Sequence, residues 1–368
     1  MNKKLLAVAV AGALALPGVA LAQSSVTISG FLKMSFGQLK LSDFSGFRAP
    51  GANSSETRLT DDSSRIVFNV VEDLGGGLRA IAQIDWRVAP DSAADGGGPT
   101  GNNHIGLQSS SWGRLLVGRQ DVHYYNRESN LTAKGDLKAD SISLLAFIQG
   151  APVAGATRTP NIVHYTTPNW GGFTAILAYS TNSGAATEAD IGAVARKGSA
   201  INFNPNLRGK NFQVGYSYWN AKPDGGGVDQ RADRLYGSYT WGGLMVGLAW
   251  DKSKFKLAAT GVETANRTAW SLPVQYTWGP HGVYGHYTKA KDDSRTVAQD
   301  GAKMFAISYQ YDLSKRTSMA VNYAKITNEV GASYNLFTSA AGTIGSPSGA
   351  VLAGEDPRLI SVTLRHAF

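Results

Sequence analysis

The sequence contains no cysteine, and it is also poor in long apolar runs and in charge. Without cysteine there can be no disulfide framework and no thiolate metal site. After residue 22 no stretch approaches the roughly 18 consecutive apolar residues that a membrane-spanning helix needs. Charged residues make up 17% of the chain, with 35 Lys and Arg against 27 Asp and Glu. This mild basic excess lacks the dense clustering of a nucleic-acid binder, so we expect no nucleic-acid partner.

The N-terminal 22 residues have the pattern of a secretory signal. Lys3 and Lys4 precede the apolar run 5–16, and the small residues Ala20 and Ala22 follow it. This order predicts a signal peptide over residues 1–22 that is cleaved before Gln23. Glycine-rich stretches recur evenly over residues 23–368 and no linker divides them, so we expect a single exported domain.

The first segment after the signal alternates apolar and polar residues. Val26, Ile28, Leu32 and Phe36 share one parity, whereas the residues between them are mostly polar. A period of two predicts a β-strand with one apolar and one polar face. Such a strand fits a soluble sandwich as well as a membrane barrel, so alternation alone leaves both possible.

Connections between the alternating segments are short and long in turn, which favours the barrel. The expected short turns are 75–77, 110–113, 169–172, 206–209, 241–243, 279–282 and 313–317. The expected long connections are 41–62, 88–102, 120–160, 180–198, 220–232, 252–266, 290–302 and 327–357. Short periplasmic turns and long external loops alternate when every strand crosses a membrane and reverses. The count predicts an all-β fold, a sixteen-stranded antiparallel transmembrane β-barrel.

Tryptophans near both ends of the strands support a membrane barrel. Trp112, Trp170, Trp241 and Trp278 each precede a glycine at a short turn, whereas Trp86, Trp250 and Trp270 lie towards long loops. Two belts of amphipathic rings are typical of a barrel that spans a bilayer. The last strand ends on Phe368, with Leu364, Val362 and Ile360 on its parity. Together with the signal, this ending indicates an outer-membrane protein of a Gram-negative bacterium.

The polar parity must then line the lumen. It includes Arg65 and Asn69 on one strand and Arg79, Asp85 and Arg87 on the next. The longest internal connection, residues 120–160, contains an apolar stretch over 142–148 that would be a liability outside the barrel. We therefore expect this third external loop to fold inward as a constriction loop. The candidate pore-lining residues are Arg65, Arg79, Arg87, Arg114, Asp121, Arg127, Glu128, Lys134, Asp136 and Lys138.

Several motifs in the same order resemble one family. They are the segments 72–79, 117–119, 165–173, 313–317 and 365–368, which together are similar to the general porins of β-proteobacteria of the Neisseria and Delftia type. The resemblance implies a trimeric outer-membrane channel for passive diffusion of ions and small hydrophilic solutes, without a cofactor and with some preference for anions. It also implies that Arg65 is one of a row of arginines that line the channel wall. Asn102 and Asn103 stand where some members have an arginine pair, so we expect weak anion selectivity.

Two alternatives remain open on the sequence. A substrate-specific sugar or anion channel could use the same barrel, and Trp219, Tyr124 and Tyr125 are the aromatic residues that could face inside. An outer-membrane enzyme would need a nucleophile, a base and an orienting group close together. The six histidines are scattered, no serine has a G-x-S-x-G setting, and no histidine pair has a metal-ligand spacing. We therefore expect neither an enzyme nor a metal site.

Overall fold

The computed structural model describes residues 24–42, 54–91, 97–127, 131, 139–148, 151–153, 155–183, 198–222, 227–336 and 351–368. Strands dominate these residues. They are β1 (Ser25–Ser42), β2 (Ser55–Asp61), β3 (Arg65–Gly75), β4 (Leu78–Arg87), β5 (Asn103–Ser109), β6 (Gly113–Asp121), β7 (Phe147–Ile148), β8 (Ala151–Pro152), β9 (Arg158–Thr166), β10 (Phe173–Ser180), β11 (Ser199–Arg208), β12 (Phe212–Lys222), β13 (Val228–Trp241), β14 (Leu244–Leu257), β15 (Glu263–Trp278), β16 (His281–Ala290), β17 (Ala302–Asp312), β18 (Thr317–Asn328) and β19 (Asp356–Ala367). A short helix, α2 (Ile142–Leu145), lies between β6 and β7.

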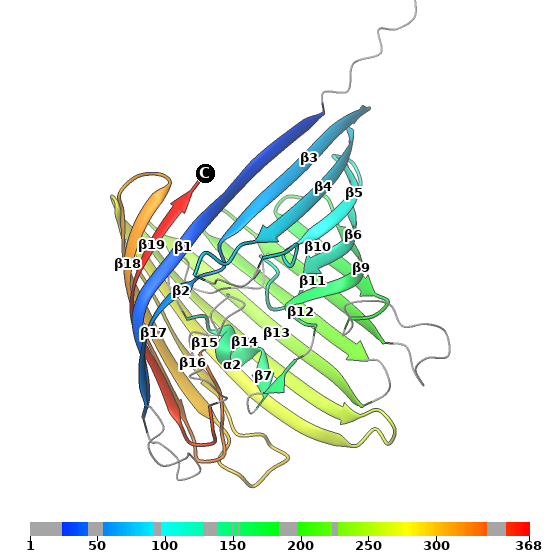
Figure 1. Cartoon of the computed structure of the whole chain (residues 1–368). Helices are drawn as coiled ribbons and strands as arrows, with labels where there is room; N and C mark the ends of the chain where they lie inside the picture. Colours follow the sequence, from blue (N-terminus) through cyan, green and yellow to red (C-terminus); the bar gives the residue numbers. More distant parts are fainter. Residues whose placement is uncertain are drawn as a thin grey trace, which may run out of the picture.

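Seventeen of these strands form one antiparallel sheet that closes on itself (Figure 1). Successive spans pair with each other, β6 pairs with β9 across the third connection, and β1 pairs with β19 to complete the ring. β2 and β3 both pair with β1, one after the other, so they act as a single interrupted span. The sheet is therefore a sixteen-stranded barrel, as predicted. Closure pairs the first span with the last, which is what a strand protein needs to cross lipid.

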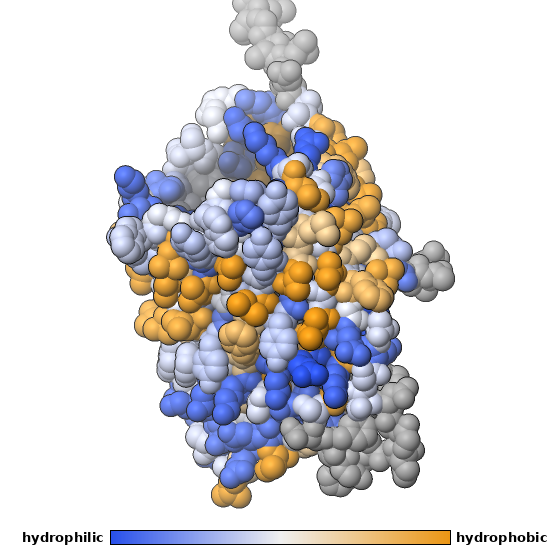
Figure 2. Space-filling model, turned by 90° about the vertical axis from the view of Figure 1, so that its left-hand side faces the viewer, coloured by the Kyte–Doolittle hydropathy of each residue, from blue (hydrophilic) through white to orange (hydrophobic). Residues whose placement is uncertain are grey.

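The two faces of the strands have opposite chemistry. On β17 the residues Phe305, Ile307 and Tyr309 are exposed on the outside, whereas Ala306 and Ser308 between them are buried on the inside. Figure 2, which shows the side of the barrel at the left of Figure 1, has an apolar band across the middle and hydrophilic residues on either side of it. In the part of the chain that the structure describes, no helix is long and apolar enough to cross a membrane.

Aromatic residues follow the predicted belts. Trp112, Trp170, Trp241 and Trp278 are all exposed close to short turns. Trp86 and Trp250 are exposed nearer the opposite ends of their strands. Trp219 is the exception, since it lies on the inner parity and is 1% exposed.

The third connection folds into the barrel, as expected. Ile142, Leu144 and Leu145 of α2 are almost completely buried. The helix packs against β15, β16 and β17 on the inner wall, where Met304 and Ile326 belong to the same apolar cluster. Figure 1 shows α2 within the outline of the barrel. Burial of this apolar stretch explains why the segment does not remain outside.

Three expected long connections are shorter than predicted. β2 occupies residues 55–61 of the expected loop 41–62, and the expected loops 220–232 and 252–266 are mostly strand in β12–β15. These strands are longer than the sequence pattern indicates, because backbone hydrogen bonding continues beyond the apolar band. Apolar and polar residues no longer alternate there. Asp229 lies opposite Lys256 and Asp233 opposite Lys252, so charged pairs replace apolar ones at these strand ends. The predicted signal peptide, residues 1–22, lies outside the described residues.

Candidate pore lining and constriction

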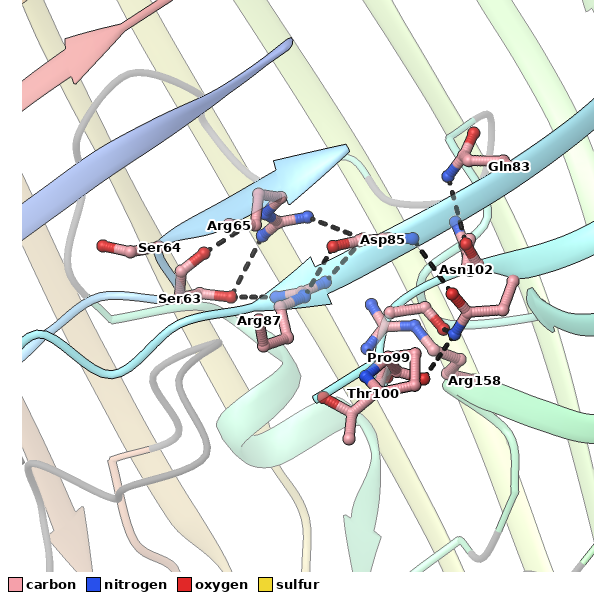
Figure 3. A network of polar contacts seen from close by, with 12 residues as sticks. Ser63, Ser64, Arg65, Gln83, Asp85, Arg87, Pro99, Thr100, Asn102 and Arg158 are labelled. Atoms are coloured by element: carbon pink, nitrogen blue, oxygen red, sulfur yellow. Dashed lines mark hydrogen bonds and ion pairs between the residues drawn. The ribbon is translucent and has the colours of Figure 1, made fainter. Parts of the chain in front are cut away.

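Two arginines and one aspartate form a polar group on the inner wall (Figure 3). Arg65 of β3 and Arg87 of β4 are directly opposite each other in the register. Asp85 joins them, with its carboxylate 3.4 Å from Nη1 of Arg65 and 2.9 Å from Nε of Arg87. The Asp85 side chain is 4% exposed, against 24% for Arg65. One acid thus lies beneath two bases, and the positive groups are nearer the lumen.

The interruption between β2 and β3 positions these arginines. Ser63 has a left-handed backbone with φ of 71°, and Asp61 holds it there by accepting the Ser63 and Ser64 amides at 2.9 and 3.0 Å. Arg65 donates to the Ser63 carbonyl at 3.2 Å and to its hydroxyl at 3.0 Å. Arg87 donates to the same hydroxyl. The break in the second span is therefore part of the site.

A second group ties the base of the inward loop to the wall. Arg158 of β9 pairs with Asp121 at the end of β6, Nε to Oδ1 at 2.9 Å. Asn102 donates to the other carboxylate oxygen of Asp121 at 2.9 Å. Asn103 accepts the backbone amide of Asp85 at 3.0 Å. The two neutral amides thus link the Asp121 and Asp85 groups without adding charge.

The closing seam adds basic groups that the sequence did not single out as a site. Phe31 of β1 lies on the inner parity between two guanidinium groups, with Arg65 at 4.8 Å and Arg365 at 4.9 Å from its ring centroid. Lys33 lies directly opposite Arg365 across the seam. Their inward parity is visible in the sequence, but their closeness to Arg65 depends on how the ring closes.

The other predicted pore residues are distributed at different depths. Arg79 and Arg114 lie near the short-turn ends of β4 and β6, on either side of Gln108, and so are apart from the Arg65 group. Arg127 is exposed just after the base of the loop. Glu128, Lys134, Asp136 and Lys138 lie outside the described residues. The structure therefore brings Arg65 and Arg87 together and places Asp121 in the neighbouring network.

The inward loop is fastened to the far wall by a buried charged cluster that sequence reasoning missed. Asp251 is fully buried between Arg234, at 3.3 Å, and Arg267, at 3.2 Å. Arg267 donates to the carbonyl of Leu144, and to that of Leu145 at 2.8 Å. Tyr124 donates to Asp251 at 3.1 Å. These contacts join β13, β14 and β15 to the start of the loop and to α2.

His123 lies in the same anchor and is fully buried. Its Nδ1 is 2.8 Å from the Ser217 hydroxyl, and Nε2 is 4.0 Å from Asp251. Burial and the nearby Arg234 guanidinium hold the pKa of His123 well below its usual value. All three side chains are closed off from the lumen, so the serine, histidine and aspartate hold the loop and are not reachable by a substrate. Within the described ranges no three His, Asp or Glu side chains are grouped as metal ligands.

Comparisons with known proteins agree with this geometry. The model of the Gram-negative porin family matches residues 7–331. Outer membrane porin protein 32 of Delftia acidovorans is 27% identical over 377 residues, with 100% of each chain covered. Major outer membrane protein P.IB of Neisseria meningitidis serogroup B is 26% identical over 355 residues, covering 94% of this chain and 98% of the relative. A solved anion-selective porin from Comamonas acidovorans has a TM-score of 0.74 at 24% identity, covering 94% of this chain and 100% of its own.

The resemblance noted in the sequence is thus confirmed, and it is a resemblance to channels rather than to enzymes. The closed barrel, the inward loop and the charged inner wall are what a diffusion channel requires. The chain belongs to the Gram-negative porin family and is an outer-membrane channel protein.

Proposed function

We propose that the channel is weakly selective for anions and that residues 120–160 form its constriction loop. The observation that carries the proposal is the row of inward bases on four adjacent strands, Arg365, Lys33, Arg65 and Arg87. Fixed charge beside a narrow aqueous path concentrates ions of the opposite sign. The solved porin with this fold from Comamonas acidovorans is named anion-selective, which supports the same sign here.

The selectivity is weak because acids partly neutralise these bases. Asp85 contacts both Arg65 and Arg87, and Asp121 contacts Arg158. Asn102 and Asn103 contribute amides to the network and no charge. These acids therefore reduce the positive charge of the wall without cancelling it.

The inner aromatic residues give no support to a sugar-specific channel. Such a channel would need ring faces open to the lumen. Trp219 and Tyr124 are 1% and 0% exposed, and the partly buried Tyr125 has Arg158 over its ring at 5.5 Å. Phe31 has Arg65 and Arg365 over its ring. General diffusion of ions and small hydrophilic solutes fits these surfaces better.

The test is the reversal potential across a planar bilayer in a KCl gradient. Replacing both wall arginines, as Arg65→Gln/Arg87→Gln, is expected to move the reversal potential towards cation preference. The change in the anion-to-cation permeability ratio should be on the order of a few-fold, since a unit charge at about 4 Å in water contributes about 1 kcal/mol. Arg231→Gln is the control, because Arg231 lies outside the barrel and is paired with Asp233. An unchanged preference in the double variant would remove these arginines from the selectivity mechanism.

We also propose that the channel is a homotrimer and that residues 1–22 are removed on export. The outer face of β1 supports the trimer, because Val26, Ile28 and Phe36 are exposed by 66%, 59% and 61%. The neighbouring Leu59 of β2 and Ile84 of β4 extend the same apolar surface. An exposed apolar surface of this kind fits a second copy of the chain as well as lipid.

A further inference from the structure

Phe31 lies in the middle of the row of inward bases. It belongs to β1, which pairs with β19 on one side and with β3 on the other (Figure 1). Arg65 is directly opposite Phe31 on β3. Arg365 is diagonal to Phe31 on β19, since its direct partner on β1 is Lys33. One aromatic side chain therefore stands between two basic side chains that come from opposite ends of the sequence.

Both guanidinium groups lie against the ring of Phe31. Cζ of Arg65 is 4.8 Å and Cζ of Arg365 is 4.9 Å from the ring centroid, within the roughly 6 Å at which a cation and an aromatic face attract each other. The face carries the negative part of the ring quadrupole, whereas the ring as a whole is neutral. Phe31 therefore holds two bases without cancelling their charge. Asp85 differs in this respect, because it adds a negative charge beside Arg65.

The two arginines depend on Phe31 to different degrees. The edge of the Arg65 guanidinium has polar partners, since Nε and Nη2 donate to Ser63 at 3.2 and 3.0 Å and Nη1 donates to Asp85 at 3.4 Å (Figure 3). In the part of the chain that the structure describes, no acid is paired with Arg365. Arg365 faces Lys33 across the seam, and like charges in this position repel. The ring of Phe31 is therefore the contact that opposes this repulsion and fixes the Arg365 guanidinium.

Contact with one ring also limits the distance between the two charges. Their separation is at most about 10 Å, which is close to the Debye length at about 0.1 M salt. An anion beside Phe31 is therefore attracted by both guanidinium groups at once. Arg87 lies directly beyond Arg65 on β4, so the basic path continues along the wall.

We propose that Phe31 is a positioning residue for anion selectivity, which holds Arg65 and Arg365 beside the ion path through contact with its ring. The inference rests on the proposed anion selectivity and adds a neutral residue to the basic wall that produces it. Without the ring, Lys33 drives the Arg365 guanidinium away from the path, and Arg65 keeps only its contacts with Ser63 and Asp85. The wall then has the same charge in a less concentrated form, so anion preference falls.

The test is the reversal potential of the folded channel in a KCl gradient across a planar bilayer. Phe31→Leu keeps an apolar side chain but removes the ring. It is expected to lower the anion-to-cation permeability ratio about two- to fivefold, the factor that one exposed cation–π contact contributes. Phe31→Trp retains an aromatic face and should keep the ratio of the wild type. The matched control is Tyr218→Leu, because Tyr218 has Arg231 over its ring at 5.1 Å on the outer face, and it should leave the ratio unchanged.

Two further variants separate positioning from a purely structural role. Pentafluorophenylalanine in place of Phe31 keeps the shape of the ring and reverses the sign of its quadrupole. It should lower the permeability ratio as Phe31→Leu does, while the folded form on unboiled gels stays as stable as wild type. Arg365→Gln removes one of the two charges that the ring holds. Adding Phe31→Leu to Arg365→Gln should therefore change the ratio less than Phe31→Leu does in the wild type.

Four outcomes would overturn the inference. If Arg65→Gln/Arg87→Gln shifts the ratio and Phe31→Leu does not, Phe31 has no role and the proposed selectivity stands. A loss of selectivity in Phe31→Leu without one in the pentafluorophenylalanine variant would assign the residue to packing. An undiminished effect of Phe31→Leu in the Arg365→Gln background would show that the ring does not act through Arg365. A wild-type channel without anion preference would refute the proposed selectivity and this inference together.

Discussion

At the scale of single residues, the charge of the inner wall depends on how many acidic side chains pair with its basic ones. Asp85 is shared between Arg65 and Arg87, which would otherwise repel each other across β3 and β4. Asp85 therefore affects anion selectivity in two opposing ways. It permits two guanidinium groups to remain adjacent, and it reduces the field that they present to an anion in the lumen.

Replacing this aspartate should separate the two effects. In Asp85→Asn the amide oxygen can still accept a hydrogen bond, but the negative charge is lost. We expect anion preference to rise by on the order of a few-fold, the opposite direction from Arg65→Gln/Arg87→Gln. Reversal potentials in a KCl gradient measure the change. Asp233→Asn is the control, since Asp233 also pairs with an arginine but lies on the outer face. A fall in anion preference would show that Asp85 does not screen the pair.

At the scale of elements, the inward loop is held by its own apolar helix and by charges on a distant wall. The apolar stretch 142–148 was sufficient to predict inward folding, because such a segment needs burial. The polar contacts that hold the loop against the wall could not be predicted. Asp251 and Arg267 lie more than 100 residues further along the chain, and parity shows only that they face inward. Which inward groups meet the loop is determined by the shape of the closed barrel.

The anchor should be sensitive to loss of one charge. Arg267 is fully buried and donates to Leu144 and Leu145 as well as to Asp251. Removing one partner from a buried ion pair typically costs about 3–5 kcal/mol, because the other charge is left uncompensated. We expect Arg267→Met to lower the temperature at which the folded form is lost on unboiled gels and to increase current noise through the open channel. Lys254→Met, on the outer face, should change neither. Unchanged current noise and unchanged thermal stability in Arg267→Met would show that the loop does not depend on this contact.

At the scale of the whole molecule, closure of the ring brings together residues from the two ends of the chain. Alternation and turn rhythm predicted the number of spans, and parity placed Arg65 and Arg87 inside. Neither could predict that Phe31 lies between Arg65 and Arg365, because this depends on the register of β1 against β19. That register is tightly constrained. At Gly37 an added Cβ would lie 2.5 Å from the carbonyl oxygen of Ile360, so only glycine allows the strands to approach as they do.

The apolar outer surface of β1 is the surface that we propose contacts another copy of the chain. Phe36 is 61% exposed in that surface, and Leu235 of β13 is 56% exposed on another part of the barrel. A glutamate on the lipid-facing side costs less than the about 2–4 kcal/mol of a lysine or arginine at the midplane, so each single variant should still fold. In a trimer, Phe36→Glu would place three carboxylates in a dry interface, whereas Leu235→Glu would meet only lipid. We therefore expect light scattering in mild detergent to show monomers for Phe36→Glu and trimers for Leu235→Glu and wild type. A wild-type monomer would refute the trimer itself, and a trimeric Phe36→Glu would move the interface away from β1.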